Sequence, residues 1–135
     1  MIETVGASIA IPGLIVGHRI NGKIHVDGGV KNPVPFNHAT QGMDLVVAID
    51  VTGRPKPITK MHPSNLELAV GSLLIMFHEL ADLRRRQAPP HIYIEPEINQ
   101  FAAGDFFKVK EIFAACEPAK DKLKRELELG VKSLG

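Results

Sequence analysis

The order of patterns along the chain predicts an α/β protein. Three observations carry this prediction: an Asn-Gly hairpin signal, a continuous apolar run typical of a covered strand, and apolar spacing typical of helices. Together they give the order hairpin, helix, strand, helix, strand, helix. This order lacks a convincing first half of the sheet.

The hairpin is predicted over residues 18–26. Two short alternating runs flank Asn21 and Gly22, the pair favoured in a type I′ turn because both central residues take positive φ. Asp27, Gly28 and Gly29 follow at once and end the second strand.

A short helix is predicted over 34–39, with Pro33 and Pro35 near its first turn and Gly42 after its end. Residues 45–51 are apolar except for Asp50, which is typical of a strand covered on both faces.

A loop with three prolines follows over 53–63. This loop could act as a lid, or it could rest against lipid through lysine and apolar side chains, which are Lys56, Ile58, Lys60 and Met61. Loops of this composition are more often plain surface connections.

The next helix is predicted to begin after Ser64, with Glu67 at the capping-box spacing. It is expected to end at three arginines, interpreted as a solvated helix end: Arg84, Arg85 and Arg86. A strand is predicted at 91–94, and Asp105 is expected to cap a last helix. Pro118 is expected to interrupt or kink that helix.

Composition sets further limits. The 135 residues include 16 basic and 15 acidic side chains, a net charge of +1, which predicts no general attraction to nucleic acid or anionic membranes. The single cysteine, Cys116, fits a reducing cytoplasm. No targeting segment and no membrane-spanning apolar run is apparent, so a cytoplasmic location is expected, with peripheral membrane contact as an option.

Several ordered motifs in the first 51 residues resemble the C-terminal signature of patatin-like phospholipases. The matching pieces, in order, are Ala7-Ser8-Ile9-Ala10-Ile11-Pro12-Gly13, then Asp27-Gly28-Gly29, then Asn32-Pro33-Val34-Pro35. The strand at 45–51 and the stretch Ile92-Tyr93-Ile94-Glu95-Pro96 also look like bacterial members of this family. The resemblance covers nearly the whole chain and implies a partial three-layer α/β fold for residues 1–135.

This resemblance implies a Ser-Asp dyad that hydrolyses lipid or other carboxylic esters through an acyl-enzyme. Asp27 corresponds to the aspartate that orients and activates the serine, and no metal or organic cofactor is implied. Gly28, Gly29, Asn32 and Pro33 are expected to shape the turn behind it. Taken alone, the Asp-Gly-Gly triplet is more readily interpreted as a tight turn that leaves a strand.

The nucleophile of the family is absent from the sequence. No G-x-S-x-G occurs, and the nearest approach, around Ser8, lacks the second glycine. Ser64 and Ser72 are interpreted as a cap and a helix residue. We therefore expect the serine and the oxyanion loop to come from a missing N-terminal segment, which would be a partner of this chain.

Two rival interpretations follow. A partial α/β unit exposes apolar sheet surface, so the chain could be a non-catalytic interaction or assembly module, and self-association is expected. A metal-dependent hydrolase built on His18, His25 and Asp27 ranks last, because the histidine spacings match no metal motif.

Overall fold

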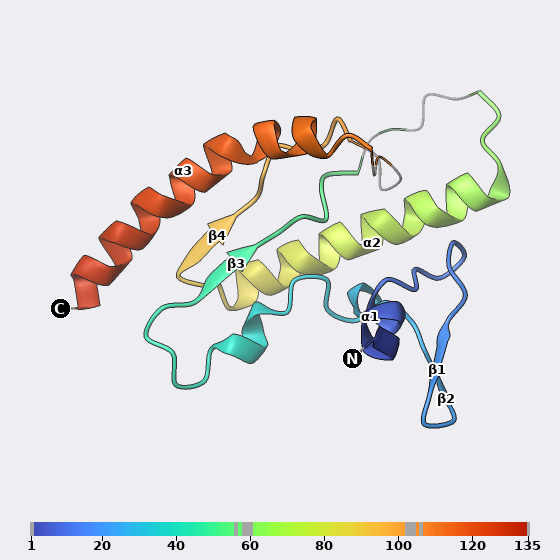
Figure 1. Ribbon diagram of the computed structural model, residues 1–135, viewed down its shortest axis with the longest axis horizontal. Coiled ribbons are helices and arrows are strands. Elements are labelled where there is room, and N and C mark those ends of the chain that lie inside the picture. Colours follow the sequence, from blue (N-terminus) through green and yellow to red (C-terminus); the bar gives the residue numbers. More distant parts are fainter. Residues whose placement is uncertain (1, 56, 58–60, 102–104, 106, 135) are drawn as a thin grey trace.

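The computed structural model describes residues 2–55, 57, 61–101, 105 and 107–134 (Figure 1). Helices and short strands alternate along the chain, which confirms the α/β class. Their order is α1 (Ile2–Ser8), β1 (His18–Ile20), β2 (Lys23–His25), the 3-10 helices η1 (Gly28–Val30) and η2 (Phe36–Ala39), β3 (Val47–Ile49), α2 (Asn65–Gln87), β4 (Ile92–Ile94) and α3 (Val109–Leu134).

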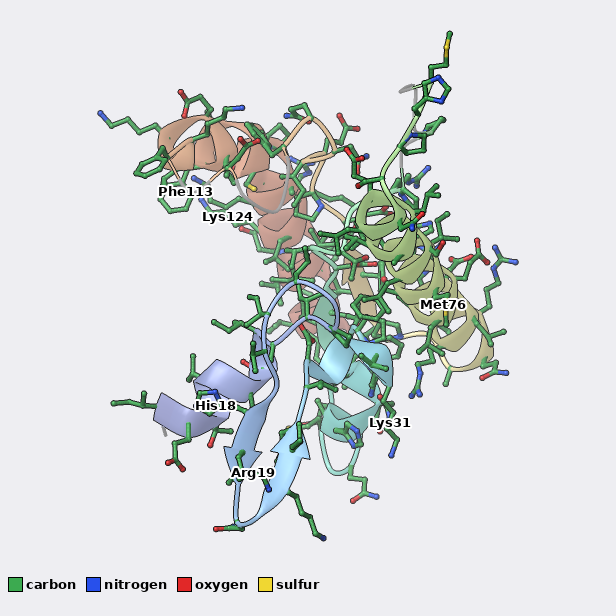
Figure 2. All side chains as sticks on the ribbon, turned by 90° about the vertical axis from the view of Figure 1, so that its right-hand side faces the viewer. His18, Arg19, Lys31, Met76, Phe113 and Lys124 are labelled. Carbon is green, nitrogen blue, oxygen red and sulfur yellow. The ribbon has the colours of Figure 1, made fainter. Side chains whose placement is uncertain are left out.

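The centre of the molecule is a two-stranded parallel sheet. β3 and β4 pair in the register Val47 with Ile92, Ala48 with Tyr93 and Ile49 with Ile94. Paired residues of neighbouring strands point to the same face, so Ala48 and Tyr93 share one face and the isoleucines share the other. The two views place α2 and α3 on opposite sides of this sheet (Figures 1 and 2).

The core lies on the α2 side of the sheet. Buried apolar side chains from three segments meet there, and Tyr93 of β4 packs against them; the buried residues are Val34, Phe36, Val46, Ala48 and Ala81. The ring of Phe36 meets the ring of Tyr93 edge to face, with centroids 6.3 Å apart. The segment that follows Asp27 is therefore fixed to the sheet and to α2 through its apolar residues.

The predicted hairpin is present. Asn21 and Gly22 have φ values of 48° and 77°, and β1 and β2 pair antiparallel around them. Positive φ at both positions is what a type I′ turn requires. The second strand ends at His25, two residues before Asp27. The prediction had placed Asp27 directly at the end of this strand, and the structure differs from it by one intervening residue.

The start of α2 confirms the predicted capping box. The Ser64 hydroxyl accepts a hydrogen bond from the Glu67 amide at 3.2 Å, and the Glu67 carboxylate accepts one from the Ser64 amide at 2.7 Å. Apolar residues occur on all sides of this helix, yet of its described residues only Phe77 and Ala81 are buried. Met76, labelled in Figure 2, is 65% exposed. Apolar residues on all sides of a helix are typical of a helix that other parts of a protein cover on all sides.

The last helix differs from its prediction at its first residue. It begins at Val109, and Asp105 instead accepts the Lys108 amide through its carbonyl and pairs with the Lys108 ammonium. Pro118 lies inside one continuous helix, whose axis changes direction along its length (Figure 1). A proline inside a helix removes one backbone hydrogen bond, a cost that the remaining turns of a 26-residue helix can offset.

Other boundaries also differ from the sequence predictions. α1 had no signal that identified it, the helix predicted at 34–39 is the short 3-10 helix η2, and β3 covers three residues of the predicted 45–51. The loop that could act as a lid was predicted over residues 53–63, of which 56 and 58–60 lie outside the described residues. Within the described part of the chain, no helix is long and apolar enough to cross a membrane.

Candidate active site

Asp27 is anchored at the point where the hairpin returns to the body of the molecule. Its amide donates to the carbonyl of Ala10, a fully buried residue, at 3.0 Å. Its carboxylate accepts the Gly29 amide at 2.7 Å and caps the 3-10 helix η1. The Ala10 contact joins the two motif segments, 7–13 and 27–29, that lie far apart in the sequence.

The carboxylate of Asp27 is partly buried and has capacity left for another partner. Among the described residues, the Gly29 amide is its single hydrogen-bond donor, and this bond uses Oδ1. Oδ2 is therefore available for a donor from outside the described residues.

The two glycines after Asp27 have different surroundings. A Cβ atom at Gly29 would lie 2.9 Å from Phe77 Cε2 and 3.1 Å from Asp27 Oδ1, so no side chain fits there without displacement. At Gly28 nothing lies within 4 Å of such an atom. Neither glycine has positive φ, so neither position requires glycine for its backbone dihedral angles. Gly29 is close to Phe77, whereas Gly28 faces open space.

Asn32 and Pro33 connect this turn to the core. The Asn32 amide group donates to Asn37 Oδ1 at 2.7 Å, and Pro33 leads directly into buried Val34. Arg84 of α2 donates to the carbonyl of Lys31 at 2.9 Å. The segment behind Asp27 is thus held by η2 on one side and by α2 on the other.

All four serines use their hydroxyl groups in local backbone contacts. Ser64 caps α2, whereas the others donate to carbonyl oxygens three or four residues earlier in their helices; these are Ser8, Ser72 and Ser133. None of them contacts Asp27 in the described part of the chain. The structure therefore brings together the predicted turn residues around Asp27 and adds no serine to them.

A second polar cluster, which sequence reasoning missed, lies at the carboxyl ends of β3 and β4. Asp50 is 4% exposed; its Oδ1 accepts the Thr52 amide and hydroxyl at 2.9 and 2.6 Å, and its Oδ2 accepts the Tyr93 hydroxyl at 2.5 Å. The carboxyl edge of a parallel sheet is where α/β proteins place ligands. The sequence offered one signal for this cluster, because Asp50 is the one charged residue within the apolar run 45–51.

The arginines at the end of α2 are more than a solvated helix end. The Arg85 guanidinium lies 4.8 Å from the Tyr93 ring centre, and Asp82 accepts from both Arg85, at 2.6 Å, and Arg86. The hydrogen bond from Arg85, with that from Arg86, holds the pKa of Asp82 below its ordinary value. These charges line a cavity of about 300 Å³ beside Asp50 and Tyr93. Because the arginines face carboxylates, the cavity carries no strong net charge.

Titration of Tyr93 should report on this cluster. Burial, and then the hydrogen bond to Asp50, raise the pKa of the Tyr93 hydroxyl well above its ordinary value of about 10. A raised folded-state pKa contributes stability that is present below pH 10 and is lost as pH rises above it. The chain has one tyrosine and no tryptophan, so ultraviolet absorbance follows Tyr93 alone.

We expect tyrosinate absorbance to appear at higher pH in the folded chain than in urea. In the Asp50→Asn variant, the ionisation should move back towards pH 10, since the carboxylate that opposes it is gone. An identical titration of folded and unfolded chain would contradict the buried Tyr93–Asp50 pair.

The residues of the metal hypothesis are arranged as a hairpin and its exit. His18 and His25 are cross-strand partners, and the His18 ring packs against Gly6 of α1 (Figure 2). Within the described ranges, no three His, Cys, Asp or Glu side chains form a group that could hold a metal ion. This arrangement gives the metal hypothesis no ligand set among those residues.

Comparison with known proteins gives a partial match. No family model matches the chain. A stretch of 50 residues, 36% of the chain, is 40% identical to uncharacterized NTE family proteins of Mycobacterium bovis and of two strains of Mycobacterium tuberculosis. The match covers 14% of the length of each relative. The chain thus shares one segment with NTE family proteins.

Proposed function

We propose that this chain is the aspartate-bearing part of a patatin-like lipid acyl hydrolase. The observation that carries the proposal is the position of Asp27, which is held by Ala10 and Gly29 with one carboxylate oxygen left for a partner. Residues 1–135 would form the C-terminal segment of the hydrolase domain, and the serine would come from a polypeptide segment that these residues do not include.

The comparison supports the lipid hydrolase class. NTE family proteins are patatin-related phospholipases, and the chain shares a 40% identical segment with members of that family. The order of the motifs at 7–13, 27–29 and 32–35 points to the same class. The match covers 14% of each relative, so the rest of each relative is long enough to carry a nucleophile outside the shared segment.

The proposed chemistry uses Asp27 as the base. A serine hydroxyl that donates to Asp27 would lose its proton as its oxygen attacks the ester carbonyl, and the alcohol would leave with that proton. Water would then attack the acyl-enzyme by the same route. The open space beside Gly28 leaves room for the segment that carries the serine, whereas Phe77 closes the side of Gly29.

A second candidate function is a non-catalytic interaction or assembly module. Two observations favour it: α2 is apolar on all sides yet largely exposed, and the outer edge of β3 is paired with no strand in the described residues. Both features suit a chain that is completed by another polypeptide.

A fluorophosphonate probe tests where the nucleophile lies. We expect the intact mass of the purified chain to stay unchanged after treatment, because every serine is occupied in a local contact and none touches Asp27. A stoichiometric adduct on one of these residues would contradict the proposal.

The same probe distinguishes the two candidate functions when it is applied to a longer polypeptide with an upstream G-x-S-x-G segment. An adduct on that serine, lost in the Asp27→Asn variant, would support the hydrolase. Absence of any adduct would favour the assembly module.

A further inference from the structure

We propose that Arg84 of α2 is a positioning residue for Asp27: its hydrogen bond to the Lys31 carbonyl fixes η1 against α2 and so sets the direction of the Asp27 carboxylate. This inference rests on the proposed function, in which Asp27 is the base. Three observations carry it: the hydrogen bonds that connect Arg84 with Asp27, a second contact between α2 and η1, and the contrast between Arg84 and the arginines beside it.

A short series of hydrogen bonds connects Arg84 with the Asp27 carboxylate. Arg84 Nη2 donates to the carbonyl of Lys31 at 2.9 Å, and Lys31 caps the C-terminal end of η1. The Lys31 amide donates to the Gly28 carbonyl at 3.0 Å, and the Gly29 amide donates to Asp27 Oδ1 at 2.7 Å. The Gly28 carbonyl and the Gly29 amide belong to one planar peptide group. A movement of Lys31 that tilts this group therefore also turns the donor that Asp27 accepts.

The turn η1 has little rigidity of its own. It comprises three residues, of which two are glycine, and its N-cap is Asp27. Short 3-10 turns have poor hydrogen-bond geometry, and glycine adds backbone freedom. The conformation of η1 therefore depends on contacts from outside the turn.

One side of α2 supplies two such contacts. Phe77 borders Gly29, and Arg84 binds the Lys31 carbonyl. Phe77 and Arg84 are seven residues apart, which is two helical turns or about 10 Å along the axis, so both lie on the same side of α2. Phe77 blocks movement of η1 towards α2, whereas the hydrogen bond from Arg84 opposes movement away from it.

The contacts of Arg84 differ from those of the next two arginines. Arg85 and Arg86 both donate to Asp82. Within the described ranges, Arg84 forms no ion pair, and its buried Nε has no hydrogen-bond partner. A buried guanidinium N–H without a partner costs free energy. The hydrogen bond to the Lys31 carbonyl is thus the polar contact that accounts for an arginine at this position.

Amide hydrogen exchange of the 135-residue chain, followed by NMR, tests whether Arg84 holds the turn. Arg84→Met keeps most of the unbranched stem and removes the donors, so the packing of the stem should persist. We expect the Gly29 and Lys31 amides to exchange about 10-fold faster than in the wild type, because local opening of η1 becomes easier. The amides of Asp50 and Ile92, which donate within the central sheet, should keep their rates.

Two further variants isolate the hydrogen bond. Arg84→Lys keeps a donor at the end of the stem, so exchange of the Gly29 and Lys31 amides should lie close to that of the wild type. Arg19→Ala is the matched control, since Arg19 also donates to a backbone carbonyl at 2.9 Å, that of Gly22. Arg19 lies on the hairpin, on a different segment from Lys31 (Figure 2), so its removal should leave exchange in η1 unchanged.

The proposal is overturned if the Gly29 and Lys31 amides of Arg84→Met exchange at the wild-type rate. It is also wrong if the amides of Asp50 and Ile92 accelerate as much, because Arg84 would then stabilise the whole fold and not this turn.

Kinetics in a polypeptide that also carries the nucleophilic segment test the effect on Asp27. Arg84→Met is expected to lower kcat for a chromogenic ester about 10- to 100-fold, the typical effect of a small displacement of a reacting group. KM should stay nearly unchanged, since Arg84 contacts the turn behind Asp27. Arg84→Lys should recover most of the lost kcat, and Arg19→Ala should leave kcat and KM at their wild-type values. A higher KM with unchanged kcat would contradict the positioning role.

Asp27→Asn in the same polypeptide separates this inference from the proposed function. If Asp27→Asn loses activity and Arg84→Met keeps it, the positioning role alone is wrong. If Asp27→Asn keeps activity, the proposed function is wrong, and Arg84 has no base to position.

Discussion

Asp27→Asn is expected to lower ester hydrolysis about 1000-fold in a polypeptide that carries both this chain and the nucleophilic segment. Asparagine keeps the shape of the side chain and can still accept the Gly29 amide, so the turn should keep its geometry. It cannot take the serine proton, so attack on the ester loses its base. The measurement is kcat/KM with a chromogenic ester, together with circular dichroism of the variant.

Asp121→Asn serves as the control for charge removal. Asp121 is exposed on α3, far along the chain from the Asp27 turn, and its replacement should leave kcat/KM unchanged. If Asp27→Asn were as active as this control, Asp27 would be a turn-forming residue and its proposed catalytic role would be wrong.

Gly29→Val is expected to lower the free energy of unfolding by about 2 kcal/mol, the typical cost of overfilling a packed site. The first added carbon would lie 2.9 Å from the ring of Phe77, a side chain that is 8% exposed and has little room to move. The same carbon would press on Asp27 Oδ1. Urea unfolding followed by circular dichroism at one fixed protein concentration measures the change.

Gly28→Val is the matched control for this substitution. Both glycines belong to η1 and would acquire the same β-branched side chain, but nothing lies within 4 Å of a Cβ atom at Gly28. We expect its effect on the free energy of unfolding to stay within about 0.5 kcal/mol. Equal losses in the two variants would show that backbone preference, and not contact with Phe77, determines the cost.

Local signals predicted the local structure well. The Asn21–Gly22 turn and the capping box of Ser64 and Glu67 were both predictable, because the atoms that define each motif lie within a few residues of one another. The strand that contains Ile92 was predictable for a similar reason, since prolines mark the break before it.

Predictions that depend on distant contacts were less successful. Aspartate is a residue type that often caps helices, yet the helix begins four residues after Asp105. Pro118 was expected to interrupt or kink the helix; α3 continues through it, and its axis changes direction along its length. Helix ends and interruptions depend on a balance between local preference and packing along the whole helix, and that packing is not visible in a short window of sequence.

The sequence by itself determined the α/β class, the hairpin, the start of α2 and the candidacy of Asp27 with its neighbouring glycines. Only the tertiary structure decided that Asp27 is tied to Ala10, that Phe77 closes the space at Gly29, and that Asp50 and Tyr93 form a buried pair. The Asp50–Tyr93 contact joins residues 43 positions apart. Periodicity and turn preference act over a few neighbouring residues, whereas such contacts arise when the sheet and α2 bring remote segments together.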